Sequence, residues 1–198
     1  MPAAHTKGPE DMFIETEGTP NPATLKFLPG REVAGEVTAD FPAAELAAIS
    51  PLAEALFALP GVARVFLGAD FVTVTRSDDA DWSDLRTRVL GAIMDHFVAG
   101  RPVLLGRPDA PAEDEDFDPD DGAVVDQIKE LLDTRVRPAV AGDGGDIIFR
   151  GFREGIVYLR MQGSCSGCPS STATLKYGIE NMLRHYVPEV VAVRPTAE

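Results

Sequence analysis

An acidic, proline-rich segment divides this chain of 198 residues. Residues 107–122, RPDAPAEDEDFDPDDG, contain eight carboxylates, three prolines and almost no apolar side chain. Such a segment cannot bury a core, and repulsion between like charges keeps it extended. The remainder is long enough for two small domains. We therefore predict domains at residues 12–100 and 123–198, joined by an acidic flexible linker at 101–122.

The first domain is predicted to mix strands and helices. Alternating and β-branched residues indicate strands at 13–16, 24–28, 62–67 and 71–75, and the last two form a hairpin. A helix is predicted at about 43–59. A second helix is predicted from Trp82 to Phe97, where apolar residues recur at steps of three and four and Asp81 precedes as a cap.

The second domain shows a similar mixture. An apolar stripe predicts a helix that starts near residue 124 and ends near Pro138. A hairpin is expected at 147–150 and 156–161, and a helix at about 175–186. Residues 190–193 are expected to close the sheet as a last strand. Asp143 to Asp146, DGGD, is interpreted as a turn rather than a metal loop. Both domains are thus predicted to be α+β.

Charge and hydropathy exclude some classes of partner. The formal net charge is −14, with −8 in residues 1–100, −6 in 101–122 and 0 in 123–198. This acidic balance argues against nucleic acid, whose binding requires clustered Lys and Arg. No apolar run is long enough to span a membrane, and residues 1–12 do not resemble a secretory signal. We expect a cytoplasmic protein, or one of the mitochondrial matrix if eukaryotic.

The only two cysteines, Cys165 and Cys168, form one Cys-x-x-Cys. Two cysteines are too few for a disulfide scaffold. The pair therefore indicates metal or redox chemistry in a reducing compartment. The motif lies in a predicted loop between a strand and a helix, flanked by Gly163, Gly167 and Pro169. Because helix N-termini favour anionic sulfur, both thiols are expected to ionise readily and to point outward.

Two ligands per chain are too few for most soft-metal sites. A tetrahedral zinc or a cubane cluster usually takes four protein ligands. None of the three histidines is well placed to serve as a further metal ligand. His5 lies at the start of the chain, His96 in the other domain, and His185 far along the next helix. The simplest route to four thiolates is a twofold dimer. Thiolate softness then favours an iron–sulfur cluster or zinc. No catalytic constellation is found, so an enzyme is not expected.

The longer pattern around the cysteines resembles a known family. Arg137-Pro138, Asp143 to Asp146 and the run from Gly163 to Ser171, GSCSGCPSS, are similar to the NifU C-terminal (Nfu) domain. This resemblance covers roughly residues 123–195. The start, residues 13–27, FIETEGTPNPATLKF, is similar to the N-terminal domain of two-domain Nfu proteins.

The resemblance implies a [4Fe–4S] cluster that bridges two subunits, with Cys165 and Cys168 of each as ligands. It also implies transfer of that cluster to apo iron–sulfur clients such as lipoyl synthase or aconitase. Two alternatives stay open: a dimeric zinc-binding interaction module and, less favoured, a thioredoxin-like dithiol oxidoreductase. Only 30 residues follow Cys168, which is too few for the sheet that follows Cys-x-x-Cys in a thioredoxin.

Overall fold

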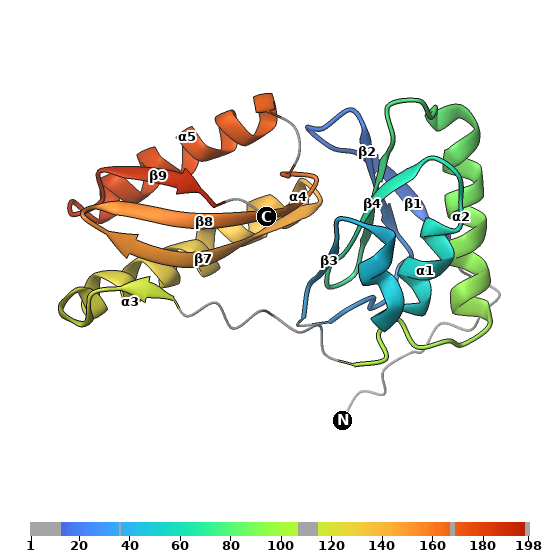
Figure 1. Ribbon diagram of the computed structural model, residues 1–198, viewed down its shortest axis with the longest axis horizontal. Coiled ribbons are helices and arrows are strands. Elements are labelled where there is room, and N and C mark those ends of the chain that lie inside the picture. The colour runs from blue at the N-terminus through green and yellow to red at the C-terminus, as the bar shows by residue number, and fades with distance from the viewer. Residues whose placement is uncertain (1–12, 36, 107–114, 167–168, 197–198) are drawn as a thin grey trace. The chain divides into compact units, whose positions relative to one another are not determined.

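The computed structural model describes residues 13–35, 37–106, 115–166 and 169–196 (Figure 1). The chain divides into two compact units, one with elements β1 to α2 and the other with β6 to β9. Each unit combines a sheet with helices, so the predicted α+β class is confirmed. In the described part of the chain, no helix is both long and apolar enough to cross a bilayer.

The first unit is built on a five-stranded antiparallel sheet in the order β1-β2-β5-β4-β3. Helices α1 and α2 pack together and bury Leu52, Leu56 and Val89 against it. Asp81 caps α2 by accepting a hydrogen bond from the Ser83 backbone N–H at 2.7 Å, as predicted. The elements are β1 (Glu15–Gly18), β2 (Thr24–Leu28), β3 (Ala39–Phe41), η2 (Ala44–Ile49), α1 (Pro51–Phe57), β4 (Val62–Leu67), β5 (Val72–Arg76) and α2 (Trp82–Val98).

The single helix predicted at 43–59 is wrong. A 3-10 turn, η2, is separated from α1 by Ser50, whose backbone is extended at φ −133° and ψ 102°. The residue before a proline is driven out of the helical region, and here that proline is Pro51. The Ser50 hydroxyl instead caps α1 by accepting from the Ala53 N–H at 3.1 Å. Strand β3 was also missed, because three residues carry too little periodicity to be detected.

His96 is a buried histidine on the core side of α2. Its side chain is only 2% exposed, and neither ring nitrogen has a hydrogen-bond partner among the described residues. Burial, and to a lesser extent the positive charge of Arg101, lower the pKa of the ring. The folded state therefore favours the neutral imidazole, whereas the unfolded chain takes up a proton near pH 6.5.

We expect the first unit to lose stability as the pH falls below about 6.5, by up to about 1.4 kcal/mol per pH unit. The sole tryptophan, Trp82, lies in this unit, so denaturant unfolding followed by its fluorescence measures the effect. His96→Leu should flatten the dependence between pH 7 and 5. If the stability of His96→Leu fell equally steeply between pH 7 and 5, another titrating group would be responsible.

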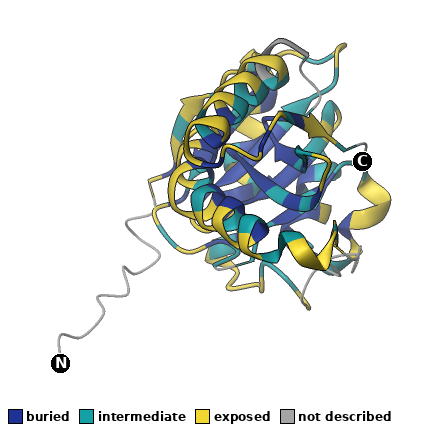
Figure 2. Cartoon of the chain, turned by 90° about the vertical axis from the view of Figure 1, so that its left-hand side faces the viewer, coloured by how far each residue is buried: buried dark blue, intermediate teal, exposed yellow. Residues whose placement is uncertain are grey.

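The second unit is a four-stranded sheet with helices on one face. Its order is β6-β7-β8-β9, with β7 and β8 antiparallel and both outer strands parallel to their neighbours. Figure 2 shows dark blue, buried strands and helices whose outer sides are exposed. The elements are β6 (Asp116–Phe117), η3 (Pro119–Asp121), α3 (Gly122–Leu131), η4 (Leu132–Val136), α4 (Arg137–Gly142), β7 (Gly145–Arg153), β8 (Ile156–Gly163), α5 (Pro169–Tyr186) and β9 (Ala192–Pro195).

The predicted helix end near Pro138 is wrong. The helical path continues from α3 through one wider π turn, η4, into α4 and ends at Gly142. A proline in a helix lacks an N–H and its ring crowds the preceding turn, and a π turn just before it relieves that conflict. The extra turn carries the chain to Asp143 and Gly144, which form the predicted turn into β7.

The predicted linker, residues 101–122, is ordered at both ends rather than being a flexible spacer throughout. Val103 and Leu104 pack against the core of the first unit, and the Leu105 N–H donates to the Ile49 carbonyl at 2.8 Å. At the other end, β6 adds to the sheet edge beside β7. These short segments escaped prediction because their pairing partners are distant in sequence. The part of the linker from residue 107 to 114 lies outside the described residues.

The last strand begins two residues later than predicted. Val190 is buried in the core of the second unit rather than paired in the sheet. Strand β9 starts at Ala192, which pairs with Ile156 of β8. The apolar pattern thus identified core residues correctly but misplaced the hydrogen-bonded segment.

Candidate functional site

Cys165 lies where β8 leads into α5. Strand β8 ends at Gly163, whose φ of 67° is the positive value expected for a glycine before the cysteine loop. Helix α5 begins at Pro169. Cys168 and Gly167 lie outside the described residues, so the pairing of the two thiols remains a prediction.

Hydrogen bonds hold the backbone around Cys165. The Ser164 hydroxyl donates to the Asp143 carbonyl, and the Ser164 N–H donates to the Gly144 carbonyl at 3.1 Å. On the other side, the Thr172 hydroxyl donates to the Cys165 carbonyl at 2.9 Å. The turn after α4 and the start of α5 therefore both fix the position of Cys165.

A salt bridge between α4 and the start of β7 stabilises the turn at Asp143 and Gly144. Arg137 donates from Nε and Nη2 to the two carboxylate oxygens of Asp146, each at 2.9 Å. Asp146 is only 4% exposed and also accepts from the Ile147 N–H at 2.8 Å. Such a two-bond fork has defined geometry, so it locks the start of β7 onto α4. No sequence pattern indicated that Arg137 and Asp146, nine residues apart, would form this pair.

Gly145 makes the approach of Cys165 to the sheet possible. A Cβ atom added at Gly145 would lie 2.5 Å from the Gln162 carbonyl oxygen and 2.9 Å from the Cys165 Sγ. Both distances are shorter than van der Waals contact. The second glycine of the DGGD turn is therefore required by close packing against the cysteine.

Cys165 is neither exposed nor acidic, contrary to prediction. Its side chain is 6% exposed and belongs to the apolar core of the unit. Burial is the main cause that raises the pKa of this thiol to about 11, the hydrogen bond with Ser164 lowers it, and the carboxylates of Asp143 and Asp146 raise it further. Before any ligand arrives, Cys165 is thus a neutral thiol, and a bound metal would have to displace its proton.

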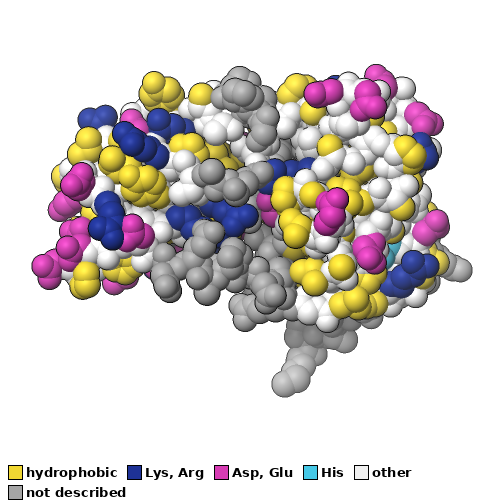
Figure 3. Space-filling view, viewed as in Figure 1, with side chains coloured by type: hydrophobic (Ala, Val, Ile, Leu, Met, Phe, Trp, Pro, Cys, Tyr) yellow, Lys and Arg dark blue, Asp and Glu magenta, His cyan; other side chains and the backbone are white. Residues whose placement is uncertain are grey.

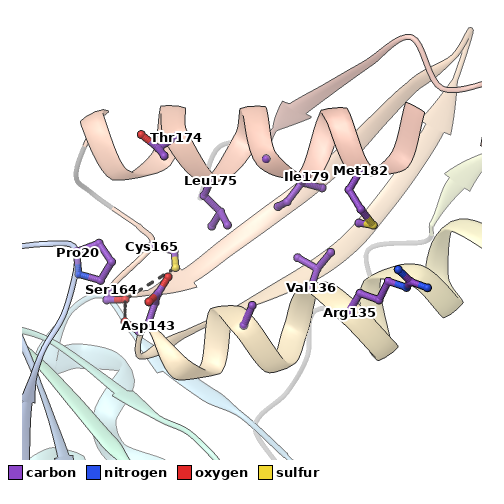
Figure 4. Close-up of a pocket in the computed structure, with 12 residues that line it drawn as sticks. Pro20, Arg135, Val136, Asp143, Ser164, Cys165, Thr174, Leu175, Ile179 and Met182 are labelled. Atoms are coloured by element: carbon purple, nitrogen blue, oxygen red, sulfur yellow. Dashed lines mark hydrogen bonds between the residues drawn. The ribbon is translucent and has the colours of Figure 1, made fainter. Parts of the chain in front are cut away.

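An apolar groove leads to Cys165 between two helices. Its walls come from the η4–α4 segment and from α5, as Figure 4 shows. Arg135 lies at one end of the groove, while Cys165, Ser164 and Asp143 lie at the other. Sequence reasoning missed this groove, because it depends on how the two helices are spaced on the sheet. The apolar lining comprises Val136, Ala139, Leu175, Ile179 and Met182.

Of the histidines weighed as additional ligands, the two that the structure describes do not join this site. His96 is buried in the first unit, and His185 lies in the last turn of α5 with its ring 4.8 Å from that of Tyr186. His5 falls outside the described residues. Within the described ranges, no three His, Cys, Asp or Glu side chains gather as a metal-ion site.

These features define a class: small two-unit α+β proteins that place a cysteine between a sheet strand and the following helix. Two family models match the chain. "Scaffold protein Nfu/NifU N terminal" matches residues 14–100, and "NifU-like domain" matches residues 128–194. Together they cover both folded units.

Curated relatives agree with these matches. The chain is 54% identical to "NifU-like protein 4, mitochondrial" of Arabidopsis thaliana, over 92% of this chain and 65% of the relative. It is 52% identical to "NFU1 iron-sulfur cluster scaffold homolog, mitochondrial" of Drosophila yakuba, over 98% of this chain and 67% of the relative. The chain spans about two thirds of the length of these curated relatives. It belongs to the Nfu family of NifU-like proteins.

Proposed function

We propose that this protein takes part in iron–sulfur cluster assembly by binding a [4Fe–4S] cluster between two subunits and passing it to apo-proteins. Cys165 and Cys168 of each subunit would supply the four thiolates. The observation that carries the proposal is the strand–cysteine–helix site in a chain whose relatives are named iron–sulfur cluster scaffolds. Soft thiolate ligands suit such a cluster.

The proposed role requires exchange of the cluster. Under this proposal the cluster is the cargo of the protein, and each subunit supplies only half of the cluster's ligands. A client thiolate replaces one protein thiolate at a time, and separation of the dimer removes two ligands together. The groove that ends at Cys165 gives an approach from one side. We infer binding and transfer rather than catalysis, so the protein is not proposed to be an enzyme.

The proposed partners are a second copy of the chain and apo iron–sulfur clients such as lipoyl synthase or aconitase. The first unit is assigned to client recognition. Neither nucleic acid nor a membrane is proposed as a partner. Of the two compartments expected from the sequence, the relatives' names support the mitochondrial one, and none of those given above supports the cytoplasm.

Anaerobic reconstitution with iron and sulfide tests this function. We expect each dimer to contain the iron and sulfide of one cluster and to absorb visible light broadly. Light scattering should show a change from monomer to dimer when the cluster binds. Addition of an apo client should move the cluster, seen as client activity and loss of the dimer. A colourless protein that binds zinc and no iron would support the zinc module instead. A cluster that never leaves the protein would rule out the carrier role.

A further inference from the structure

The first unit has an open hollow between α2 and the edge of its sheet. The hollow has a volume of about 600 Å³ and lies between β2 and the first half of α2. Its apolar walls are Leu25, Trp82 and Leu90, which are partly exposed and pack on the core of the unit. These walls suit an apolar side chain of a partner. The lining is completed by Ser83, Arg86 and Thr87 of α2.

Gly18 leaves the space beside this hollow empty. It ends the edge strand β1 and pairs with Leu25, so both positions face the helices. A Cβ atom at Gly18 would meet nothing within 4 Å, and the backbone there is not in the left-handed region. Neither packing nor conformation therefore requires a glycine, although glycine weakens a strand. A glycine in such a position often marks a place where another backbone approaches closely.

The outer edge of β1 has no paired strand among the described residues, because β1 is the first strand in the order of its sheet. An edge strand presents N–H and C=O groups to which an extended segment can add. Strands lie about 4.8 Å apart, so an added strand would lie about 10 Å from β2. Because Gly18 has no side chain, an apolar side chain of the added strand can cross this gap and contact Leu25.

Charged groups around the hollow restrict the kind of segment that fits. Arg86 is exposed, and its side chain has no recorded ion pair or hydrogen bond in the described part of the chain. Because alternate strand residues point to opposite faces, Glu15 lies on the other face of β1 from Gly18. Figure 3 shows further Asp and Glu side chains, in magenta, over the visible side of the first unit. A complementary segment thus has a carboxylate beside its apolar residue and basic residues on its other face.

We propose that β1 and this hollow, defined together as the β1–α2 site, bind an extended segment of a client protein. One apolar side chain of the segment contacts Leu25 and Trp82. A carboxylate two residues further along pairs with Arg86, because residues two apart share one face of a strand. Basic side chains between and beside them face Glu15. The proposal rests on the client-recognition role assigned above to the first unit, and it adds the surface and the sequence pattern that is recognised.

Titration of the full-length protein with the peptide TKLKEKT, followed by the fluorescence of Trp82, tests the proposal. The leucine and glutamate of this peptide share one face of a strand, and its lysines share the other. Trp82 is the sole tryptophan and lies in the wall of the hollow, so its fluorescence responds to binding directly. We expect saturable binding. Replacing the leucine of the peptide with alanine should weaken it at least about tenfold, because most of the buried apolar area is lost.

Two variants of the protein test the two halves of the site. Gly18→Leu should fill the hollow and weaken binding at least about tenfold, without lowering the denaturant midpoint of the first unit. Arg86→Gln should weaken binding about two- to fivefold and remove the preference for TKLKEKT over TKLKQKT. The matched control is Arg88→Gln, which changes the net charge equally on the same helix outside the hollow. It should bind both peptides as the wild type does.

Three results of the titration would overturn the proposal. They are no saturable binding by the wild type, equal affinity of Gly18→Leu and the wild type, and an equal loss of affinity in the two arginine variants. Tighter binding of hexanoate than of the peptide would assign the hollow to small carboxylic acids and would also overturn it.

Cluster loading and transfer separate this proposal from the function proposed above. Gly18→Leu should load iron as the wild type does, because Gly18 belongs to the unit without the cysteines. It should pass the cluster to apo lipoyl synthase or apo aconitase several-fold more slowly. A wild type that binds the peptide but no iron would refute the cluster role alone. Transfer by Gly18→Leu to both clients at the wild-type rate would overturn docking of clients at the β1–α2 site.

Discussion

Replacing Cys165 with serine is expected to abolish cluster binding. The change removes one thiolate per subunit and two from the dimer, and serine is a poor ligand for a soft metal. Even changes outside the ligand shell lower metal affinity by about 10- to 100-fold, so iron per dimer should fall at least about tenfold. The cluster-dependent dimer should disappear with it. Iron and sulfide analysis and light scattering after anaerobic reconstitution measure both effects.

Cys168→Ser should give the same result, because both cysteines are proposed as ligands. Ser166→Ala is the matched control, since it changes the same loop without removing a thiol, and it should retain the cluster. Circular dichroism should show both cysteine variants folded, because serine has nearly the shape of cysteine. Full iron loading by either cysteine variant would contradict the proposed ligand set.

Gly145→Ala is expected to destabilise the second unit and to lower cluster loading. The new methyl group would overlap the Gln162 carbonyl oxygen at 2.5 Å and crowd the Cys165 Sγ at 2.9 Å. Overpacking of this kind costs about 1–3 kcal/mol. Relief of the overlap must move either β8 or the cysteine, so iron loading should drop several-fold. Denaturant unfolding followed by circular dichroism, together with iron analysis, measures the two effects.

Gly142→Ala provides the matched control for this prediction. A Cβ at Gly142 meets nothing within 4 Å, and the residue ends α4, where alanine is tolerated better than glycine. We expect unchanged loading and no loss of stability. Trp82 fluorescence should report an unaltered first unit in both variants. Normal stability and loading in Gly145→Ala would show that the close contact is not needed to position Cys165.

Local pattern predicted the long elements well. The helix from Trp82, its cap at Asp81 and both hairpins were placed near their observed bounds, because their apolar periodicity is strong and continuous. Strands β3 and β6 were missed because each has two or three residues and exists only through pairing with a distant strand. The helix break at Ser50 was also missed, although Pro51 carried the signal.

The site was predicted in part. Cys165 lies between strand and helix as expected, while the position of Cys168 stays a prediction. The expected acidity of Cys165 was wrong, since helix position alone suggests a lowered pKa, whereas burial and two nearby carboxylates raise it. Asp143 and Asp146 were interpreted only as turn residues. The structure shows that the Asp143 carbonyl also holds Ser164 next to the cysteine and that the Asp146 carboxylate pairs with Arg137.

The number of thiols, the division into two α+β units and the resemblance to the Nfu family can all be obtained from the order of the amino acids. Two ligands per chain already make a second subunit the simplest source of a full ligand shell, because ligand count depends on composition alone. The burial of Cys165, the need for a residue without a side chain at Gly145 and the groove that ends at the sulfur are visible only in the folded chain. These properties depend on packing between β7, β8, α4 and α5, which are brought together only when the chain folds.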